Sequence, residues 1–194
     1  LRAARAEAYV KTNYLLRLAA RLKFKYAAEW IDNYLEETGE KTVLYGLHKK
    51  CVAAVHRRYG DSCVVVDGSV TGRRRDAAVW AFQHDAKKRV FMGELRAASE
   101  AITLTAARMV GFLEMWWNPA KHNQGEARVH RIGQHFPTFS YYFVAKGTVE
   151  VAMAEVLQEK QSTQNTILDG GHVEGSLDIF DLFLERLAEN GEDR

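Results

Sequence analysis

Residues Cys63–Ser69 read CVVVDGS, and this short run decides the class of fold. Three consecutive valines favour a β-strand, because branched side chains fit a pleated surface. The run does not alternate with polar residues, which is typical of a strand buried on both faces in a parallel sheet. The sequence therefore predicts a parallel sheet that is covered by helices on both sides.

Strands and helices alternate along the chain on either side of this run. Such alternation predicts an α/β domain with right-handed crossovers and helices flanking the sheet. The expected strands cover 41–47, 89–93, 107–115 and 138–144, and the expected helices cover 48–60, 73–83, a segment from Pro119 onward and 148–161. Functional groups in these folds gather in the loops that follow the strands, here after Leu47, Asp67, Gly93, Glu114 and Val144.

The two ends of the chain are predicted to be helical extensions of this domain. Residues 1–37 carry apolar side chains at three- and four-residue steps, and this helix leads into a domain over 38–161. Residues 162–194 read as a polar linker and an amphipathic helix, which we expect to pack back on the domain; a partner surface is the alternative. The chain begins without methionine, and we expect it to be a piece of a longer protein.

The composition is that of an ordinary globular protein. Hydrophobic residues make up 47% and charged residues 27%, and a net charge of +2 does not by itself indicate nucleic acid. Basic runs at 73–75 and 87–89 are compatible with a solvated face. No stretch approaches the roughly 20 apolar residues of a membrane span, so no membrane partner is expected. The two cysteines lack metal-ligand spacing, which favours buried, reduced thiols in an intracellular protein. We expect the protein in the cytoplasm or nucleoid if it is bacterial or from a phage, and in the nucleus if it is eukaryotic.

A donor-rich stretch, QGEARVHRIGQ, occupies residues 124–134. On a helix that starts at Pro119, Gln124, Arg128 and Arg131 would share one face, while Val129 and Ile132 would point toward the sheet. Two neighbouring guanidinium groups repel unless they meet an anion, and their planar geometry suits phosphate oxygens. The alternative is that both arginines pair with local carboxylates such as Glu114 or Glu126.

The residues around this stretch resemble a known family. WWNPAKHNQGEARVHRIGQ at 116–134, followed by YYFVAKGTVE at 141–150, resembles the C-terminal RecA-like lobe of SWI/SNF-type ATPases in helicase superfamily 2. The resemblance runs from about Lys41 to Gln161 and includes KTVLYGLHKK and VVVDGSVTGRRRDAAVWAFQ. The combination of FLEMWWNP with RVHRIGQ most resembles the annealing-helicase branch, which remodels stalled replication forks.

The resemblance implies one half of an ATP-driven motor. Proteins of this family bind ATP between two RecA-like lobes and move along duplex DNA. The chain contains no G-x-x-x-x-G-K-[ST] sequence, so ATP and Mg²⁺ are expected to be bound mainly by an N-terminal lobe of the same protein. By similarity, Arg131 is the arginine finger, Arg128 is its companion and Gln124 reaches into the same cleft.

The resemblance also assigns residues to the DNA backbone. His48 and Lys49 follow the first strand, whereas Thr103 and Thr105 occupy the loop where relatives touch the tracked strand. The small residues before a helix N-terminus, Gly68, Ser69 and Thr71, form a natural anion site, with a plain capped turn as the alternative. Ser99, Glu100 and Ala101 stand where many relatives have glycines.

The leading hypothesis is therefore the second ATPase lobe of an ATP-dependent translocase acting on double-stranded or forked DNA. Its partners would be the N-terminal RecA-like lobe and the DNA. A non-catalytic DNA-binding or regulatory module with the same fold is the first alternative. The motor subunit of a restriction or phage-defence system is the second.

Overall fold

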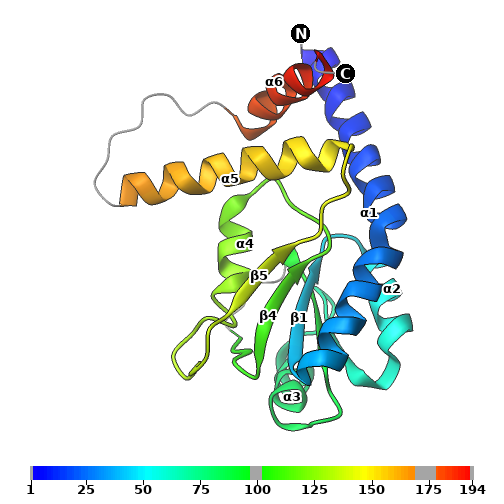
Figure 1. The fold of residues 1–194 in the computed structure, drawn as a ribbon, viewed down its shortest axis with the longest axis vertical. Helices are drawn as coiled ribbons and strands as arrows, with labels where there is room; N and C mark the ends of the chain where they lie inside the picture. The colour runs from blue at the N-terminus through cyan, green and yellow to red at the C-terminus, as the bar shows by residue number, and fades with distance from the viewer. Residues whose placement is uncertain (1, 97–101, 169–177, 193–194) are drawn as a thin grey trace. The chain divides into compact units, whose positions relative to one another are not determined.

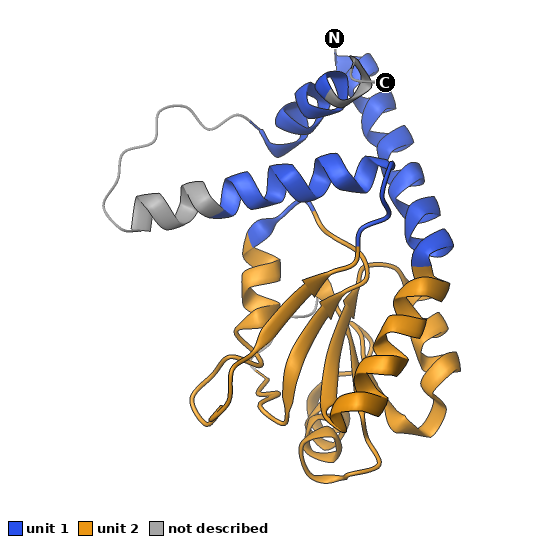
Figure 2. Ribbon diagram, in the orientation of Figure 1, with its two compact units in different colours: residues 1–23, 117–119, 144–194 blue, residues 24–116, 120–143 orange. Residues whose placement is uncertain are grey.

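The computed structural model describes residues 2–96, 102–168 and 178–192. Their contacts divide the chain into two compact units (Figure 2). One unit comprises residues 1–23, 117–119 and 144–194, and the other comprises residues 24–116 and 120–143. The second unit contains the sheet, and we refer to it as the sheet unit.

Five parallel strands form the sheet, in the order β2-β3-β1-β4-β5 (Figure 1). The parallel sheet predicted from the valine run is thus confirmed. Leu44 at the centre of β1 lies opposite Met92 on one side and Gly111 on the other. The strands are β1 (Lys41–Gly46), β2 (Cys63–Val66), β3 (Val90–Glu94), β4 (Ala107–Phe112) and β5 (Phe139–Tyr142).

Successive side chains of the central strands enter two different cores, as expected for a sheet covered on both faces. Leu44 joins one core and Tyr45 the other. The Leu44 core includes α2 (Lys49–Tyr59) and residues of α1 (Arg2–Thr38) that belong to the sheet unit. The Tyr45 core includes Phe82 of α3 (Gly72–His84) and Val129. A 3₁₀ turn, Gly60–Ser62, leads from α2 into β2.

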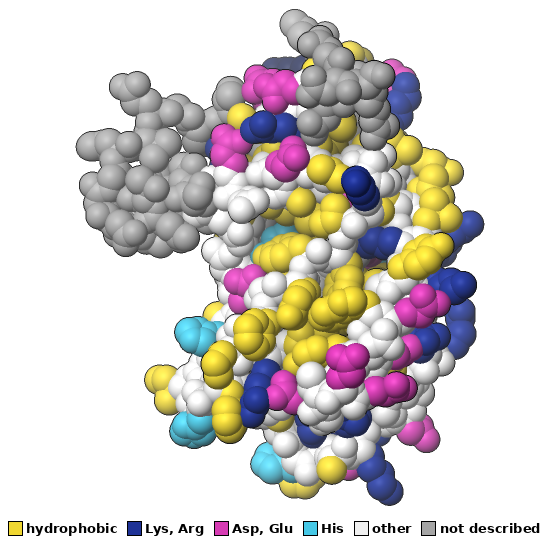
Figure 3. Space-filling view, viewed as in Figure 1, with side chains coloured by type: hydrophobic (Ala, Val, Ile, Leu, Met, Phe, Trp, Pro, Cys, Tyr) yellow, Lys and Arg dark blue, Asp and Glu magenta, His cyan; other side chains and the backbone are white. Residues whose placement is uncertain are grey.

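The edge strand β5 leaves aromatic side chains in solvent. Phe139 is 53% exposed and Tyr141 is 37% exposed, and Trp30 of α1 lies 4.7 Å from the Tyr141 ring. Hydrophobic side chains also gather on the face of the molecule that the space-filling view shows (Figure 3). The fold thus buries the central strands and exposes one face of the last one.

The other unit contains α5 (Val149–Leu168), α6 (Ile179–Glu192) and the first part of α1. Lys23 and Glu150 form a buried ion pair of 2.6 Å, and Glu150 also accepts the Ala145 N–H. Phe180 of α6 contacts the rings of Tyr9, Trp117 and Phe183, so α6 packs on the first part of α1 and on Trp117. Among the described residues, no helix is both long enough and apolar enough to cross a membrane.

Candidate functional site

The loops that follow β1 and β4 are joined through one buried carboxylate. Glu114 Oε2 accepts the backbone N–H groups of Leu47 and His48, at 2.7 and 2.9 Å. Its Oε1 lies 2.8 Å from Nδ1 of His48. Burial disfavours the charged form of Glu114, but the His48 and Leu47 hydrogen bonds outweigh burial and lower the pKa of the carboxyl group below its usual value. Glu114 therefore positions His48 at the N-cap of α2.

The helix that was predicted to carry the donor-rich stretch is shorter than expected. Helix α4 begins at Pro119, as predicted, but ends at Glu126. Beyond it the backbone tightens, because Arg128 N–H bonds the carbonyl of Gly125 rather than one four residues earlier. The single helical face carrying Gln124, Arg128 and Arg131 is therefore wrong: only Gln124 lies on the helix.

Two contacts explain why the helix stops. The Arg128 carbonyl accepts the Leu104 N–H at 2.8 Å and so leaves the helical hydrogen-bond series. Val129 is fully buried in the Tyr45 core, as predicted, whereas Ile132 is 100% exposed and does not face the sheet. A continued helix would have to break the first contact and withdraw Val129 from the core. We call residues 127–134 the arginine turn.

The Arg131 guanidinium is held by neutral oxygens. Its Nη1 donates to the Ile102 carbonyl at 3.1 Å and to Thr103 Oγ1 at 3.3 Å. Arg131 is exposed, and it forms no ion pair with any residue in the described part of the chain. For Arg131, the alternative of pairing with Glu114 or Glu126 is therefore wrong.

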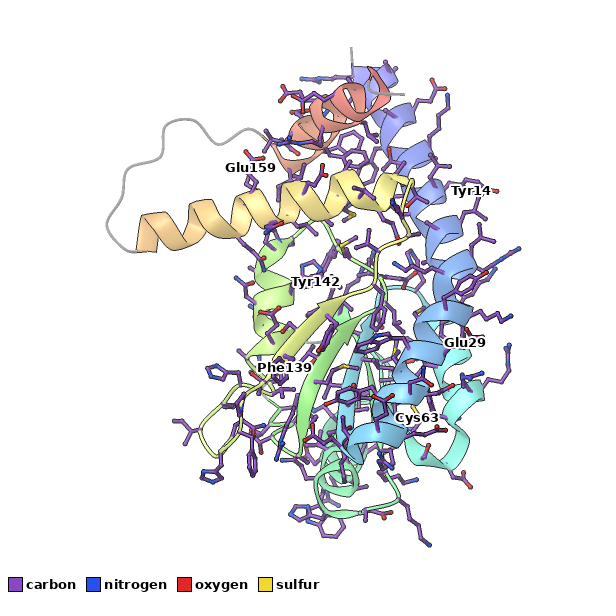
Figure 4. All side chains as sticks on the ribbon, viewed as in Figure 1. Tyr14, Glu29, Cys63, Phe139, Tyr142 and Glu159 are labelled. Atoms are coloured by element: carbon purple, nitrogen blue, oxygen red, sulfur yellow. The ribbon has the colours of Figure 1, made fainter. Side chains whose placement is uncertain are left out.

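Both carboxylates proposed for that alternative have other partners. Glu114 binds Leu47 and His48, as described above. Glu126 accepts the hydroxyl of Tyr142, at 3.0 Å, and Figure 4 labels this tyrosine on β5. Glu114 therefore connects the loops after β1 and β4, and Glu126 connects α4 to β5.

Gln134 at the end of the arginine turn was not assigned a role from the sequence. Its Nε2 donates to the carbonyls of Thr105 and Ala107, at 3.1 and 2.8 Å. Together with the Leu104 and Arg131 bonds, this amide ties the arginine turn to the loop that enters β4. Buried carbonyl groups of a loop need hydrogen-bond donors. The amide of Gln134, at the end of the donor-rich stretch, could therefore have been predicted as such a donor from the sequence.

In the turn after β2, the N–H and O–H donors of Gly68 and Ser69 bond to carboxylates of the protein. Gly68 N–H donates to Glu94 at 3.2 Å, and Ser69 donates to Asp67 through both its N–H and its hydroxyl, at 2.9 and 2.6 Å. The Ser69 hydroxyl lowers the pKa of Asp67. Thr71 occupies the N-cap of α3, as predicted, but its side chain makes no capping bond. A phosphate at this turn would therefore compete with two carboxylates.

The remaining predicted residues differ in how they are held. Thr103 contacts Arg131, whereas Thr105 accepts a hydrogen bond from Gln83 at 3.2 Å and is half-buried. Lys49 is exposed in the first turn of α2. Residues 99–101, which replace the usual glycines, lie outside the described residues.

The structure thus brings Arg131 and Thr103 together, while the turn after β2 lies elsewhere, since β3 and β1 separate β2 from β4. Within the described residues, no cluster of three or more His, Cys, Asp or Glu side chains is arranged to hold a metal ion.

The amino-acid sequence of this chain is similar to those of known proteins. Residues 23–133 match the family described as helicase conserved C-terminal domain. The SWI/SNF-related matrix-associated actin-dependent regulator of chromatin subfamily A-like protein 1 of Xenopus tropicalis is 33% identical over 144 residues, covering 73% of this chain and 15% of that protein. DNA annealing helicase and endonuclease ZRANB3 of Homo sapiens is 32% identical over 149 residues, covering 73% and 13%. The chain thus spans only a small part of the length of these relatives.

Solved structures share the fold. The C-terminal part of the Fun30 ATPase domain matches with a TM-score of 0.62 and 20% identity, covering 71% of this chain and 44% of that one. The Sulfolobus solfataricus SWI2/SNF2 ATPase core in complex with dsDNA matches with a TM-score of 0.59 and 24% identity, covering 76% and 32%. The sheet order, the helices and the family match agree with one another. The chain belongs to the helicase conserved C-terminal domain family and is the C-terminal, RecA-like lobe of a SWI/SNF-type ATPase of helicase superfamily 2.

Proposed function

We propose that this lobe completes the ATP site of a DNA-stimulated motor, with Arg131 as the arginine finger and Arg128 beside it. The observation that carries the proposal is the exposed Arg131 guanidinium, held by a carbonyl and a hydroxyl and by no described acid. An exposed guanidinium attracts an anion, and its fork suits phosphate.

The donor set fits ATP. The bonds of Arg131 to the described residues Ile102 and Thr103 start from Nη1, and a guanidinium carries five N–H donors in a planar fork. Gln124 on α4 carries a side-chain amide and precedes Arg128 and Arg131 in the same stretch of sequence. ATP, held with Mg²⁺ mainly by the N-terminal lobe, supplies the phosphoryl group that is transferred to water. Arg131 and Arg128 would stabilise the charge that develops on that group, and Gln124 would help to orient them.

The same lobe is proposed to hold the DNA backbone. Lys49 is exposed in the first turn of α2, His48 before it is held by Glu114, and Thr103 lies in the loop that enters β4. Such groups contact phosphates without reading sequence. Gly68 and Ser69 would add a second phosphate site once Glu94 and Asp67 release them, with Thr71 beside them at the N-cap of α3. Thr105 is half-buried and accepts a hydrogen bond from Gln83.

Relatives support a motor over a non-catalytic module. One is described as ATP-dependent helicase rhp16 and another as a DNA annealing helicase and endonuclease. A solved structure of the same fold holds dsDNA. These descriptions belong to those proteins, and they favour double-stranded DNA as the partner and ATP hydrolysis as the reaction of the longer protein.

The test is Arg131→Ala in the full-length protein, with exposed Arg57→Ala on α2 as the matched control. DNA-stimulated ATP hydrolysis should fall about a thousandfold or more, because a finger contributes that much to the rate, while binding of a fluorescent ATP analogue persists. The control should hydrolyse ATP at the parental rate. Turnover of the Arg131 variant within about twofold of the parent would reject the proposal.

DNA contact is tested on the 194-residue chain itself. Binding of a labelled duplex, followed by fluorescence anisotropy, should weaken steeply between about 50 and 200 mM salt, since phosphate contacts release counterions. An affinity that does not change with salt would reject backbone contacts.

A further inference from the structure

The hydroxyl of Tyr45 is a buried polar group that neither the fold nor the site described above uses. Tyr45 lies on β1 and is 1% exposed, and its hydroxyl has no hydrogen-bond partner among the described residues. Burial raises the pKa of Tyr45, so the group stays protonated and is a donor. Phenylalanine would fill the same space without leaving a polar atom unpaired in the core.

Two glycines fix the ring at its hydroxyl end. A Cβ at Gly93 of β3 would lie 2.7 Å from Tyr45 Cε1, and a Cβ at Gly125 of α4 would lie 2.9 Å from Cε2. The ring also stacks on Phe112, with centroids 5.6 Å apart. Because the ring is enclosed on both edges, the position of the hydroxyl is set by the fold.

The segment around Gly125 contains groups that match this donor. Gln124 directly precedes Gly125, and its Oε1 is a buried acceptor without a hydrogen-bond partner among the described residues. Arg128 donates its backbone N–H to the Gly125 carbonyl, and its charge acts on the Tyr45 hydroxyl against the effect of burial. The Tyr45 ring thus packs against Gly125, the residue that follows the Gln124 acceptor in α4, and the charge of Arg128 acts on its hydroxyl.

We propose that Tyr45 is a positioning residue that orients the Gln124 amide when the ATP site is assembled. The two groups are not bonded to each other in this structure. In the assembled site, the Tyr45 hydroxyl donates to Gln124 Oε1. An amide held through its oxygen must turn its NH₂ group the other way, toward the phosphates that Arg128 and Arg131 face. This inference rests on the proposed function, and it concerns the orientation of Gln124 alone.

The experiment is a double-mutant cycle in the full-length protein with Tyr45→Phe and Gln124→Ala. One neutral hydrogen bond corresponds to about a two- to tenfold change in rate, so Tyr45→Phe should lower kcat for DNA-stimulated ATP hydrolysis by that factor. Tyr45→Phe should have no further effect when Gln124 is already alanine, because the amide to be oriented is gone. The melting temperature of Tyr45→Phe should equal or exceed that of the parent.

Three outcomes would overturn the inference: a parental kcat for Tyr45→Phe, effects of the two substitutions that multiply, or a lowered melting temperature. The last would mean that the hydroxyl has a partner in the fold itself. Arg131→Ala in the same assay separates the two proposals. If that variant keeps its turnover, the proposed function fails; if it loses turnover while Tyr45→Phe does not, only the role of Tyr45 fails.

Discussion

Arg131 Nη1 donates to Thr103 Oγ1 across 3.3 Å, so a residue proposed for ATP touches a residue proposed for DNA. Gln134 and the Arg128 carbonyl add further hydrogen bonds between the arginine turn and the loop that enters β4. A shift of either segment therefore moves the other. Through this contact, DNA bound to the loop would change the position of the Arg131 guanidinium.

Replacing Thr103 with valine should weaken that coupling. The substitution keeps the shape of the side chain and removes the hydroxyl that accepts from Arg131, while the Ile102 carbonyl remains. We expect the ratio of ATPase rates with and without DNA to fall by about two- to tenfold in the full-length protein. Thr38→Val is the matched control, since Thr38 also uses its hydroxyl, bonding Tyr34 and Glu40 at the end of α1. A parental ratio for Thr103→Val would exclude coupling through this contact.

Glu114 should make the stability of the 194-residue chain depend on pH. The folded pKa of its carboxyl group lies below the ordinary value of 4.5, so the charged form stabilises the fold. This contribution is fully present above about pH 5.5 and is lost as the pH falls through the folded pKa. Glu114→Gln should lower the free energy of unfolding by about 1–3 kcal/mol at pH 7, measured with urea.

The difference between the parent and Glu114→Gln should shrink as the pH is lowered from 7 toward about 3, since protonation removes the same charge. Glu29→Gln, at a side chain of α1 that is 53% exposed, is the matched control. A difference that stays constant with pH would contradict the role of the Glu114 charge.

The buried Lys23–Glu150 pair should respond strongly to the loss of one partner. Their side chains are only 9% and 2% exposed, so Lys23→Ala leaves a carboxylate charged and poorly solvated. The expected loss is about 3–5 kcal/mol in the free energy of unfolding. Lys25→Ala, whose ammonium is 78% exposed and 3.9 Å from Glu29, should change it by less than about 0.5 kcal/mol. Equal effects of the two substitutions would mean that burial of the pair adds nothing.

The parallel sheet could be predicted because Val64, Val65 and Val66 encode a strand without polar alternation, and local composition reports burial directly. The arginine turn could not be predicted in the same way. Its geometry depends on the Leu104 N–H and on the core position of Val129, and both are contacts between distant segments. Helical periodicity alone therefore extended α4 too far.

In the candidate site, too, the residue types could be predicted from the sequence, whereas their contacts could not. Arg131 could be identified from its neighbours in the sequence, whereas its contact with Thr103 required the fold. Glu114 was considered as a partner for the arginines, because sequence spacing does not show that β1 and β4 end side by side. The pairing of these strands gives the carboxylate to Leu47 and His48 instead.

Gly125→Ala sets helix propensity against packing around Tyr45. Alanine favours a helix by about 1 kcal/mol over glycine, which would stabilise α4. Its Cβ would lie 2.9 Å from Tyr45 Cε2, and relieving such overpacking costs about 1–3 kcal/mol. The cost of overpacking should exceed the gain in helix propensity, so the free energy of unfolding should fall.

Tyr45→Leu lacks the ε carbons, so adding Gly125→Ala to that variant should lower the free energy of unfolding by less than adding it to the parent. Tyr45→Phe keeps Cε2 and should give no relief. A Gly125→Ala chain as stable as the parent would show that the ring can move aside, and the hydroxyl of Tyr45 would then not be fixed by the fold.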